Sequence, residues 1–198
     1  MKKGVVLSMG VRIAQWVHGT SVQIEFPERL DRGNPVGNPD ATPFSQFTLL
    51  NGVRRRGEGA YFRADRSLKP PVDNWFHFAI PTPAILDGAR PELTRVYVLY
   101  KTFNLVQITN VHLYDGPNIT KEFNNLLLSG AHNGAVDSSN EFLIYPPFPI
   151  QFGLGVSVRV EFIIDIGFDA PGAPDVLCTS AGADFIDSIR PPVGPFTT

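Results

Sequence analysis

Residues 155–164 read Gly155-Val156-Ser157-Val158-Arg159-Val160-Glu161-Phe162-Ile163-Ile164, and this stretch decides the fold. From residue 156 to residue 162 an apolar residue stands at every second position, with polar residues between. Successive side chains of a β-strand point to opposite faces, so one face of this strand is buried and the other meets water. The apolar set is Val156, Val158, Val160 and Phe162. Such a strand needs partners in a sheet.

Further strands are expected on both sides of this stretch. They are rich in β-branched and aromatic residues, and Gly, Pro, Asn or Asp separates them, as at the Asn51-Gly52 turn. Strands recurring at roughly 8 to 15 residues with turn signals between them are typical of antiparallel sandwiches. The expected strands are residues 11–18, 21–26, 47–50, 74–80, 93–102, 107–114, 141–145, 150–164, 176–179 and 185–189. The sequence therefore predicts an all-β protein, an antiparallel β-sandwich that is jelly-roll-like, with at most one short helix.

That helix is expected over residues 119–128, where apolar residues fall near helical spacing. No linker divides the chain, so residues 1–189 are expected to form a single β-sandwich domain. Residues 190–198 include three prolines, which lack the N–H that a sheet ladder needs. We expect them to form a proline-rich C-terminal tail that is mobile or docks on a neighbouring subunit.

The composition bears on the class of partner and on the compartment. Of 198 residues 18% are charged and the formal net charge is −2, so no general attraction to nucleic acid or to an anionic membrane is expected. Arg12 interrupts the N-terminal apolar run, and no small-residue cleavage site follows, which argues against a signal peptide. No window reaches the roughly 18 apolar residues that span a bilayer. The compartment stays open, with a cytoplasmic location favoured over export.

Signatures of catalysis are missing from the sequence. It contains no Gly-x-Ser-x-Gly nucleophile elbow and no Gly-x-x-x-x-Gly-Lys phosphate loop. Cys178 is the only cysteine, and a free cysteine is most often a small buried hydrophobe. A reactive thiol or an intermolecular disulfide is the alternative for Cys178. We expect a protein that is not an enzyme and needs no cofactor.

The candidate metal ligands are the histidines and the loop aspartates. Three histidines lie on expected strands without the His-x-His pair usual in metal sites on jelly rolls: His18, His77 and His112. Histidines satisfied by hydrogen bonds or solvent are the more frequent case. Three aspartates share a loop rich in Gly and Pro but lack the EF-hand spacing: Asp165, Asp169 and Asp175. No metal site is predicted, and convergence of the histidines and calcium binding by the loop are left open.

Three segments carry a resemblance. They read Trp16-Val17-His18-Gly19-Thr20-Ser21-Val22, Trp75-Phe76-His77 through Ile80-Pro81-Thr82-Pro83, and Val111-His112-Leu113-Tyr114-Asp115-Gly116. Together they resemble a family of uncharacterised microbial β-rich proteins, over roughly residues 14 to 164. The resemblance implies no activity, because no function is assigned to that family.

The function expected first is self-association, as a homo-oligomeric shell, ring or filament subunit. Residues 53–69 are basic, whereas residues 161–187 are acidic and contain no Lys or Arg. Head-to-tail contact between two such segments closes into rings or propagates as filaments. Two solvated loops are the alternative explanation of this charge pattern. The residues assigned to the contact are Arg54, Arg55, Arg56, Asp165, Asp169, Asp175 and Phe196.

The alternative function is a β-sandwich module that binds carbohydrate or another ligand. Jelly rolls often bind glycans on exposed Trp or Tyr rings, although the aromatic residues of a small domain more often belong to its core. Two or more such rings on one exposed face would favour glycan binding over self-association. The candidates are Trp16, Trp75 and Tyr114, with Tyr61 and Tyr97 also available.

Overall fold

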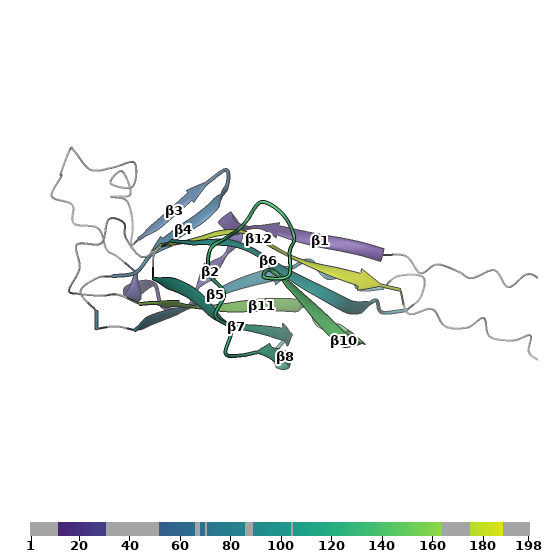
Figure 1. Ribbon diagram of the computed structural model, residues 1–198. Coiled ribbons are helices and arrows are strands. Elements are labelled where there is room, and N and C mark those ends of the chain that lie inside the picture. The colour runs from purple at the N-terminus through teal and green to yellow at the C-terminus, as the bar shows by residue number, and fades with distance from the viewer. Residues whose placement is uncertain are drawn as a thin grey trace, which may run out of the picture.

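The structure, a computed structural model, describes residues 12–30, 52–65, 68–69, 71–85, 89–103, 105–163 and 175–187. Two antiparallel sheets pack face to face (Figure 1). The predicted all-β sandwich is therefore confirmed. The expected strand at 47–50, the tail with Phe196, and Asp165 and Asp169 lie outside the described residues.

Seven strands form the larger sheet. They are β1 (Arg12–His18), β3 (Val53–Arg56), β4 (Gly59–Arg63), β6 (Glu92–Phe103), β9 (Ala131–His132), β10 (Glu141–Pro149) and β12 (Asp175–Ile186). Their order is β10-β6-β12-β4-β3, with β1 also paired to β12 and β9 to β6. The long strand β12 thus joins three partners.

Five strands form the smaller sheet, which lies below the larger one in Figure 1. They are β2 (Gln23–Ile24), β5 (Val72–Ile80), β7 (Val106–Asp115), β8 (Asn118–Phe123) and β11 (Leu154–Phe162). Their order is β2-β5-β11-β7-β8. Two 3-10 turns, η1 (Gly19–Ser21) and η2 (Pro27–Arg29), flank β2. Within the described ranges no helix has the length and apolar character needed to cross a bilayer.

Strand β11 lies at the centre of the smaller sheet, as its alternation predicts. It pairs with β5 on one side and with β7 on the other. Its apolar side chains point into the space between the sheets, where each is at most 1% exposed. This buried set is Val156, Val158, Val160 and Phe162. The side chains between them point to the outer face.

Aromatic pairs join the two sheets across the core. Phe62 on β4 packs against Phe76 on β5, with ring centroids 4.6 Å apart. At the side of the sandwich where β8 and β10 are the edge strands, Phe123 meets Phe142 at 5.1 Å. Such tilted pairs add to the free energy gained by burying the rings. The core is therefore continuous from the first pair to the second.

The predicted short strands at 176–179 and 185–189 are corrected to one strand, β12. The small residues between them suggested an interruption, but Gly182 lies inside the ladder and pairs with Trp16 on β1 and Tyr97 on β6. The Trp16 ring covers Gly182 so closely that a Cβ there would come 2.4 Å from it. A neighbouring aromatic ring thus replaces the side chain that Gly182 lacks, and the strand continues.

The helix predicted over residues 119–128 is wrong. Residues 118–123 form β8, which returns along β7 after a two-residue turn at Gly116-Pro117. Gly116 takes a φ of 57°, a conformation that glycine adopts without strain. The turn directs the chain straight into a hairpin, and pairing with β7 overrides the helical spacing of the apolar side chains.

Two further boundaries differ from the sequence prediction. The Pro-rich stretch 146–149, expected as a turn, belongs to β10, whose pairing with β6 shifts register between Leu143 and Phe148. Proline is tolerated there because β10 is an edge strand. Within the basic segment 53–69, where none of the expected strands lies, β3 and β4 form a hairpin with its turn at Gly57-Glu58.

Asp115 fixes the loop between β10 and β11. Its carboxylate accepts the backbone N–H groups of Gln151 at 2.8 Å, Phe152 at 2.6 Å and Gly153 at 3.2 Å. Burial acts to raise the pKa of Asp115, but these three donors and the nearby Arg90 outweigh it and hold the pKa below its ordinary value of 3.8. The ionised form therefore stabilises the fold.

Replacing Val158 by Asp should unfold the domain. The substitution buries an unpaired carboxylate between the sheets, at a cost of several kcal/mol against a typical total stability of roughly 5–15 kcal/mol. The matched control is Arg159→Ala, which removes a half-exposed ion pair with Asp73 and should cost about 0.5 kcal/mol. Urea unfolding of the two variants checks this. Equal effects would contradict the register of β11.

Replacing Asp115 by Asn should cost about 1–3 kcal/mol at neutral pH, because the loop N–H groups lose an ionised acceptor. A carboxyl group whose pKa is lowered by folding stabilises above its ordinary pKa, and this contribution disappears as the pH falls through the lowered value. The stability difference between wild type and variant should therefore shrink between pH 7 and about pH 2. Urea titrations across that range measure it. A constant difference would exclude the ionised carboxylate as the cause.

Candidate functional site on the outer face of the five-stranded sheet

The outer face of the five-stranded sheet carries a row of polar side chains. At its centre is Ser157 on β11, which pairs with His77 on β5 and with His112 on β7. Gln23 on β2 extends the row beyond His77, and Glu122 on β8 extends it beyond His112. Five strands thus contribute one polar residue each to the row.

A shallow hollow of about 510 Å³ opens at one end of this face. Gly155 and Ala79, neighbours in the ladder between β11 and β5, form its floor, and Tyr114 stands next to Gly155 on β7. The floor lies at backbone level because Gly155 has no side chain, and a Cβ there would lie 3.4 Å from Tyr114 Cβ. The polar side chains around the hollow are Gln23, Glu25, His77 and Ser157.

His77 is held between two of these groups. Its Nδ1 lies 2.8 Å from Ser157 Oγ, and its Nε2 lies 3.2 Å from Glu25 Oε2. A carboxylate only accepts hydrogen bonds, so in neutral His77 Nε2–H donates to Glu25 and Nδ1 accepts the Ser157 hydroxyl. The imidazole is oriented from both sides. The rim of the hollow therefore offers donors and acceptors in fixed positions.

The other end of the face is organised around Trp75. Its ring lies against the His112 imidazole, with centroids 4.8 Å apart and planes at 51°. His112 Nε2 in turn lies 2.8 Å from Asn124 Oδ1. Arg159 donates to Asp73 at 2.9 Å, and Asp73 also accepts Arg29 at 2.7 Å. This end thus presents an aromatic ring beside cations that are already paired.

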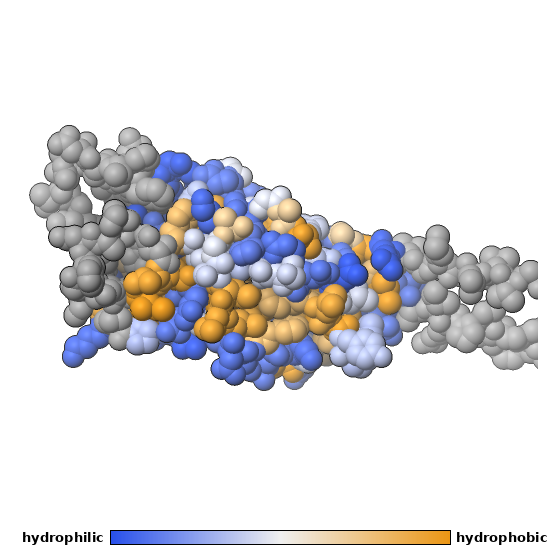
Figure 2. All heavy atoms as spheres, in the orientation of Figure 1, coloured by the Kyte–Doolittle hydropathy of each residue, from blue (hydrophilic) through white to orange (hydrophobic). Residues whose placement is uncertain are grey.

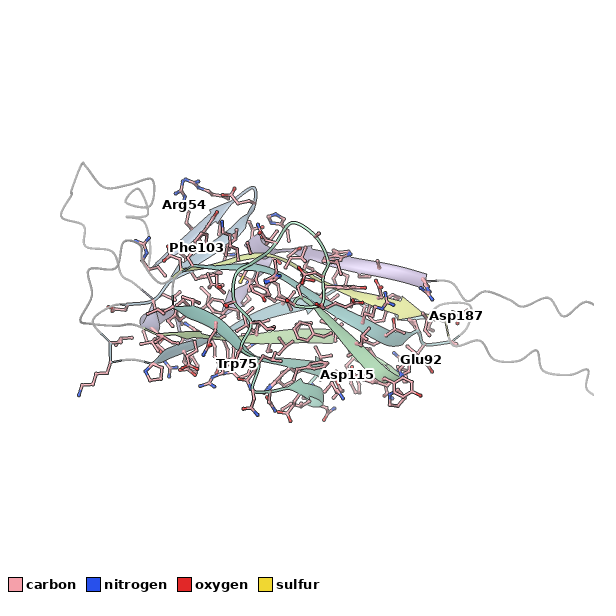
Figure 3. All side chains as sticks on the ribbon, viewed as in Figure 1. Arg54, Trp75, Glu92, Phe103, Asp115 and Asp187 are labelled. Atoms are coloured by element: carbon pink, nitrogen blue, oxygen red, sulfur yellow. The ribbon has the colours of Figure 1, made fainter. Side chains whose placement is uncertain are left out.

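The aromatic candidates divide between the two outer faces. Trp75 and Tyr114 share the face of the hollow, and Figure 3 shows Trp75 on the side of the five-stranded sheet, away from Arg54. Trp16 lies on the larger sheet, stacked on Tyr97 with centroids 5.2 Å apart and planes at 15°. Tyr61 is also on that sheet, in β4. Two of the five candidates therefore lie on the face of the hollow, and the other three belong to the larger sheet.

The histidines do not form a metal site in the described part of the chain. His77 and His112 share one row, but His18 lies on the other sheet, with Nε2 3.0 Å from Gly57 O. Among the described residues no group of three or more His, Cys, Asp or Glu side chains is placed to hold a metal ion. Of the proposed calcium loop, Asp175 is described, and it accepts Arg63 at 2.9 Å and 3.1 Å.

That ion pair also bears on the proposed contact between basic and acidic segments. Arg63 belongs to β4 and Asp175 to β12, which are neighbours in one sheet, and Asp175 is 5% exposed. Arg55 donates to the carbonyl groups of Thr20 and Val22 in its own chain. Self-association stays a prediction, but Asp175 is not available to an incoming subunit.

Cys178 is buried in the core, as expected for a lone cysteine. Burial raises the pKa of its thiol to about 12, so the thiolate is scarce at neutral pH. A reactive thiol at this position is thereby disfavoured.

Sequence reasoning missed most of the hollow. Ser157 and Gly155 belong to the stretch that decides the fold, but the alternating pattern does not mark them as part of a binding site. Glu25 and Gln23 precede them by more than a hundred residues. The available signal was the pair of small residues on the wetted face of the central strand, since such positions leave room for a ligand.

Comparison with models of protein families gives a match. A family model described as a family of unknown function, DUF6623, matches residues 50–178. It includes β5, β7 and β11, and therefore Trp75, Tyr114 and Ser157, whereas Gln23 and Glu25 precede it. This match confirms the resemblance to proteins without an assigned function. No curated protein matches the chain.

Proposed function

The chain belongs to this family of unknown function, and we propose that it is a carbohydrate-binding β-sandwich module whose ligand lies on the outer face of the five-stranded sheet. One observation carries the proposal: a hollow with a bare floor, an aromatic wall at Tyr114 and a polar rim. A pyranose ring has apolar C–H faces and a periphery of hydroxyl groups. It therefore matches a site that combines one aromatic surface with several hydrogen-bonding groups.

The rim suits hydroxyl groups in particular. The carboxylate of Glu25 accepts hydrogen bonds, whereas the Gln23 amide both donates and accepts. A hydroxyl also does both, so each rim group finds a complement on a sugar. His77 is already oriented by Ser157 and Glu25, which lowers the entropy lost when a ligand binds. The site is open and shallow, as binding to a polysaccharide requires.

Filling the floor should abolish binding without harming the fold. Gly155 is not among the glycines with positive φ, and a Cβ there would make ordinary contact with Tyr114, so the backbone accepts a side chain at this position, as in Gly155→Val. Glycine inside a strand costs roughly 0.5–1 kcal/mol relative to alanine, so the melting temperature should stay level or rise. Gly155→Ala should have an intermediate effect. Retention on gels containing neutral polysaccharides, scored beside thermal melts, measures both properties.

Tyr114→Ala should weaken retention on the same gels by removing the aromatic wall. The matched control is Tyr61→Ala, which removes the same side chain from the other sheet and should leave retention unchanged. If both tyrosine variants bind like wild type, or if Gly155→Val binds normally, this face is not the site. If the wild type binds none of a panel of polysaccharides, the carbohydrate proposal is wrong.

A second candidate, self-association, is favoured by a separate observation. Exposed apolar side chains occur on β8, on β10 and on the segment that joins β8 to β9, at the side of the sandwich where β8 and β10 are the edge strands. They are Ile119 at 51%, Leu127 at 76% and Leu143 at 61% exposure. Figure 2 shows an apolar band along the middle of the molecule. Exposed apolar patches of this kind often mark interfaces, and a second copy is the partner we propose.

Leu127→Lys combined with Leu143→Lys should yield monomers if this surface mediates self-association. Both side chains are exposed in the monomer, so the fold should be retained. The matched control is Arg54→Glu combined with Arg56→Glu on the basic hairpin, which should leave the mass unchanged. Light scattering coupled to gel filtration reports the mass. A monomeric wild type contradicts the proposal, and loss of assembly in the arginine variant alone would favour the charge-based contact instead.

A further inference from the structure

The hollow is one end of a longer surface. Outward-facing residues continue from Tyr114 through the row of His77, Ser157 and His112 to Trp75, which pairs with Arg159. Tyr114 and Trp75 lie two strands and four residues apart, which corresponds to about 16 Å between their Cα atoms at standard strand spacing and rise. This distance is longer than one pyranose ring and suits a short oligosaccharide.

The surface between the two aromatic residues is both polar and immobilised. His77 is held by Ser157 and Glu25, and His112 is held by Asn124 and by the Trp75 ring. Side chains that are already fixed lose little rotamer entropy on binding. The histidine side chains between Tyr114 and Trp75 are therefore already held in position before a ligand binds.

The charges on this path disfavour an acidic ligand. Glu25 at the hollow carries a carboxylate whose partner is His77. At the opposite end, Arg159 is paired with Asp73, which is itself shared with Arg29. An anionic sugar would meet Glu25 and would have to displace Asp73 to reach Arg159, whereas a neutral sugar needs neither step.

We propose that the face binds a neutral glycan chain of several units, which crosses β7, β11 and β5 diagonally, with one ring in the hollow beside Tyr114 and another on Trp75. This inference rests on the proposed carbohydrate-binding function. It adds the length, the direction and the charge of the ligand, and it makes Trp75 a contact that only a longer chain reaches.

Calorimetric titration with neutral oligosaccharides of increasing length tests the inference. The probes are the cello-, xylo- and malto-oligosaccharides, each from disaccharide to hexasaccharide. In the series that binds, affinity should rise with length until the chain spans both rings and then level off. Trp75→Ala should remove this gain, a loss of roughly three- to tenfold for the longest probe, and leave the affinity for the disaccharide unchanged.

Matched variants keep the test interpretable. Trp75→Leu retains an apolar side chain without the ring and should behave like Trp75→Ala, and thermal melts confirm that both are folded. Trp16→Phe changes the tryptophan of the other outer face and should leave the length dependence intact. Polygalacturonate, an acidic chain, should bind more weakly than the neutral probes.

The outcomes separate the two proposals. Affinity that does not depend on length, while Gly155→Val still abolishes binding and Tyr114→Ala still weakens it, overturns the extended path and leaves the carbohydrate site in place. Preference for polygalacturonate overturns the neutral assignment. Failure of every probe and polysaccharide overturns the proposed function, and the extended path falls with it.

Discussion

The alternation along β11 is the constraint on which both the core and the candidate site depend. Val158 and its apolar neighbours fill the space between the sheets, while Ser157 and Gly155 on the same strand face outward. A slip of one residue would exchange the two faces, so burial of the valines fixes the register of β5 and β7 on either side. The positions of His77 and His112 around Ser157 follow from that register. The stability of the core therefore positions the polar face.

The position of the rim of the hollow depends on the hydrogen bonds of a buried polar side chain. Asn74 is fully buried, and its side chain donates to Phe26 O at 2.7 Å and accepts Phe26 N–H at 3.1 Å. These bonds, together with the one from Glu25 N to Trp75 O at 3.0 Å, hold the chain after β2 against β5. Because a buried amide without partners is costly, this connection is strongly favoured. It brings Glu25 to His77, and Asn74 thereby acts as a positioning residue for the rim.

Strands that are marked by the residue pattern of their own segment could be predicted from the sequence. The β-branched and aromatic residues of β6 gave a strand with nearly correct bounds, and the alternation in β11 gave a correct strand whose first residue is Leu154 rather than the predicted residue 150. Strand β12 was divided in two because Gly182 is tolerated only under the ring of Trp16, which lies more than 160 residues earlier. Trp75 and Tyr114 were named from residue type, but the hollow beside Tyr114 was not predicted. Its rim needs Ser157 beside His77, a contact 80 residues apart in sequence, which follows from strand order alone.

The two tryptophans show why exposure by itself does not identify a binding surface. Trp16 is 40% exposed, more than Trp75, yet its ring covers Gly182 in a central strand and stacks on Tyr97. Removing that ring would uncover the backbone of β12, so its position is explained by the fold. Among the described glycines none has the Trp75 ring against it, and Trp75 lies against an imidazole at the end of a polar path that begins in an open hollow. What lies beneath and beside each ring, rather than its exposed area, explains Trp16 by the fold and is the reason that Trp75 is proposed as a ligand contact.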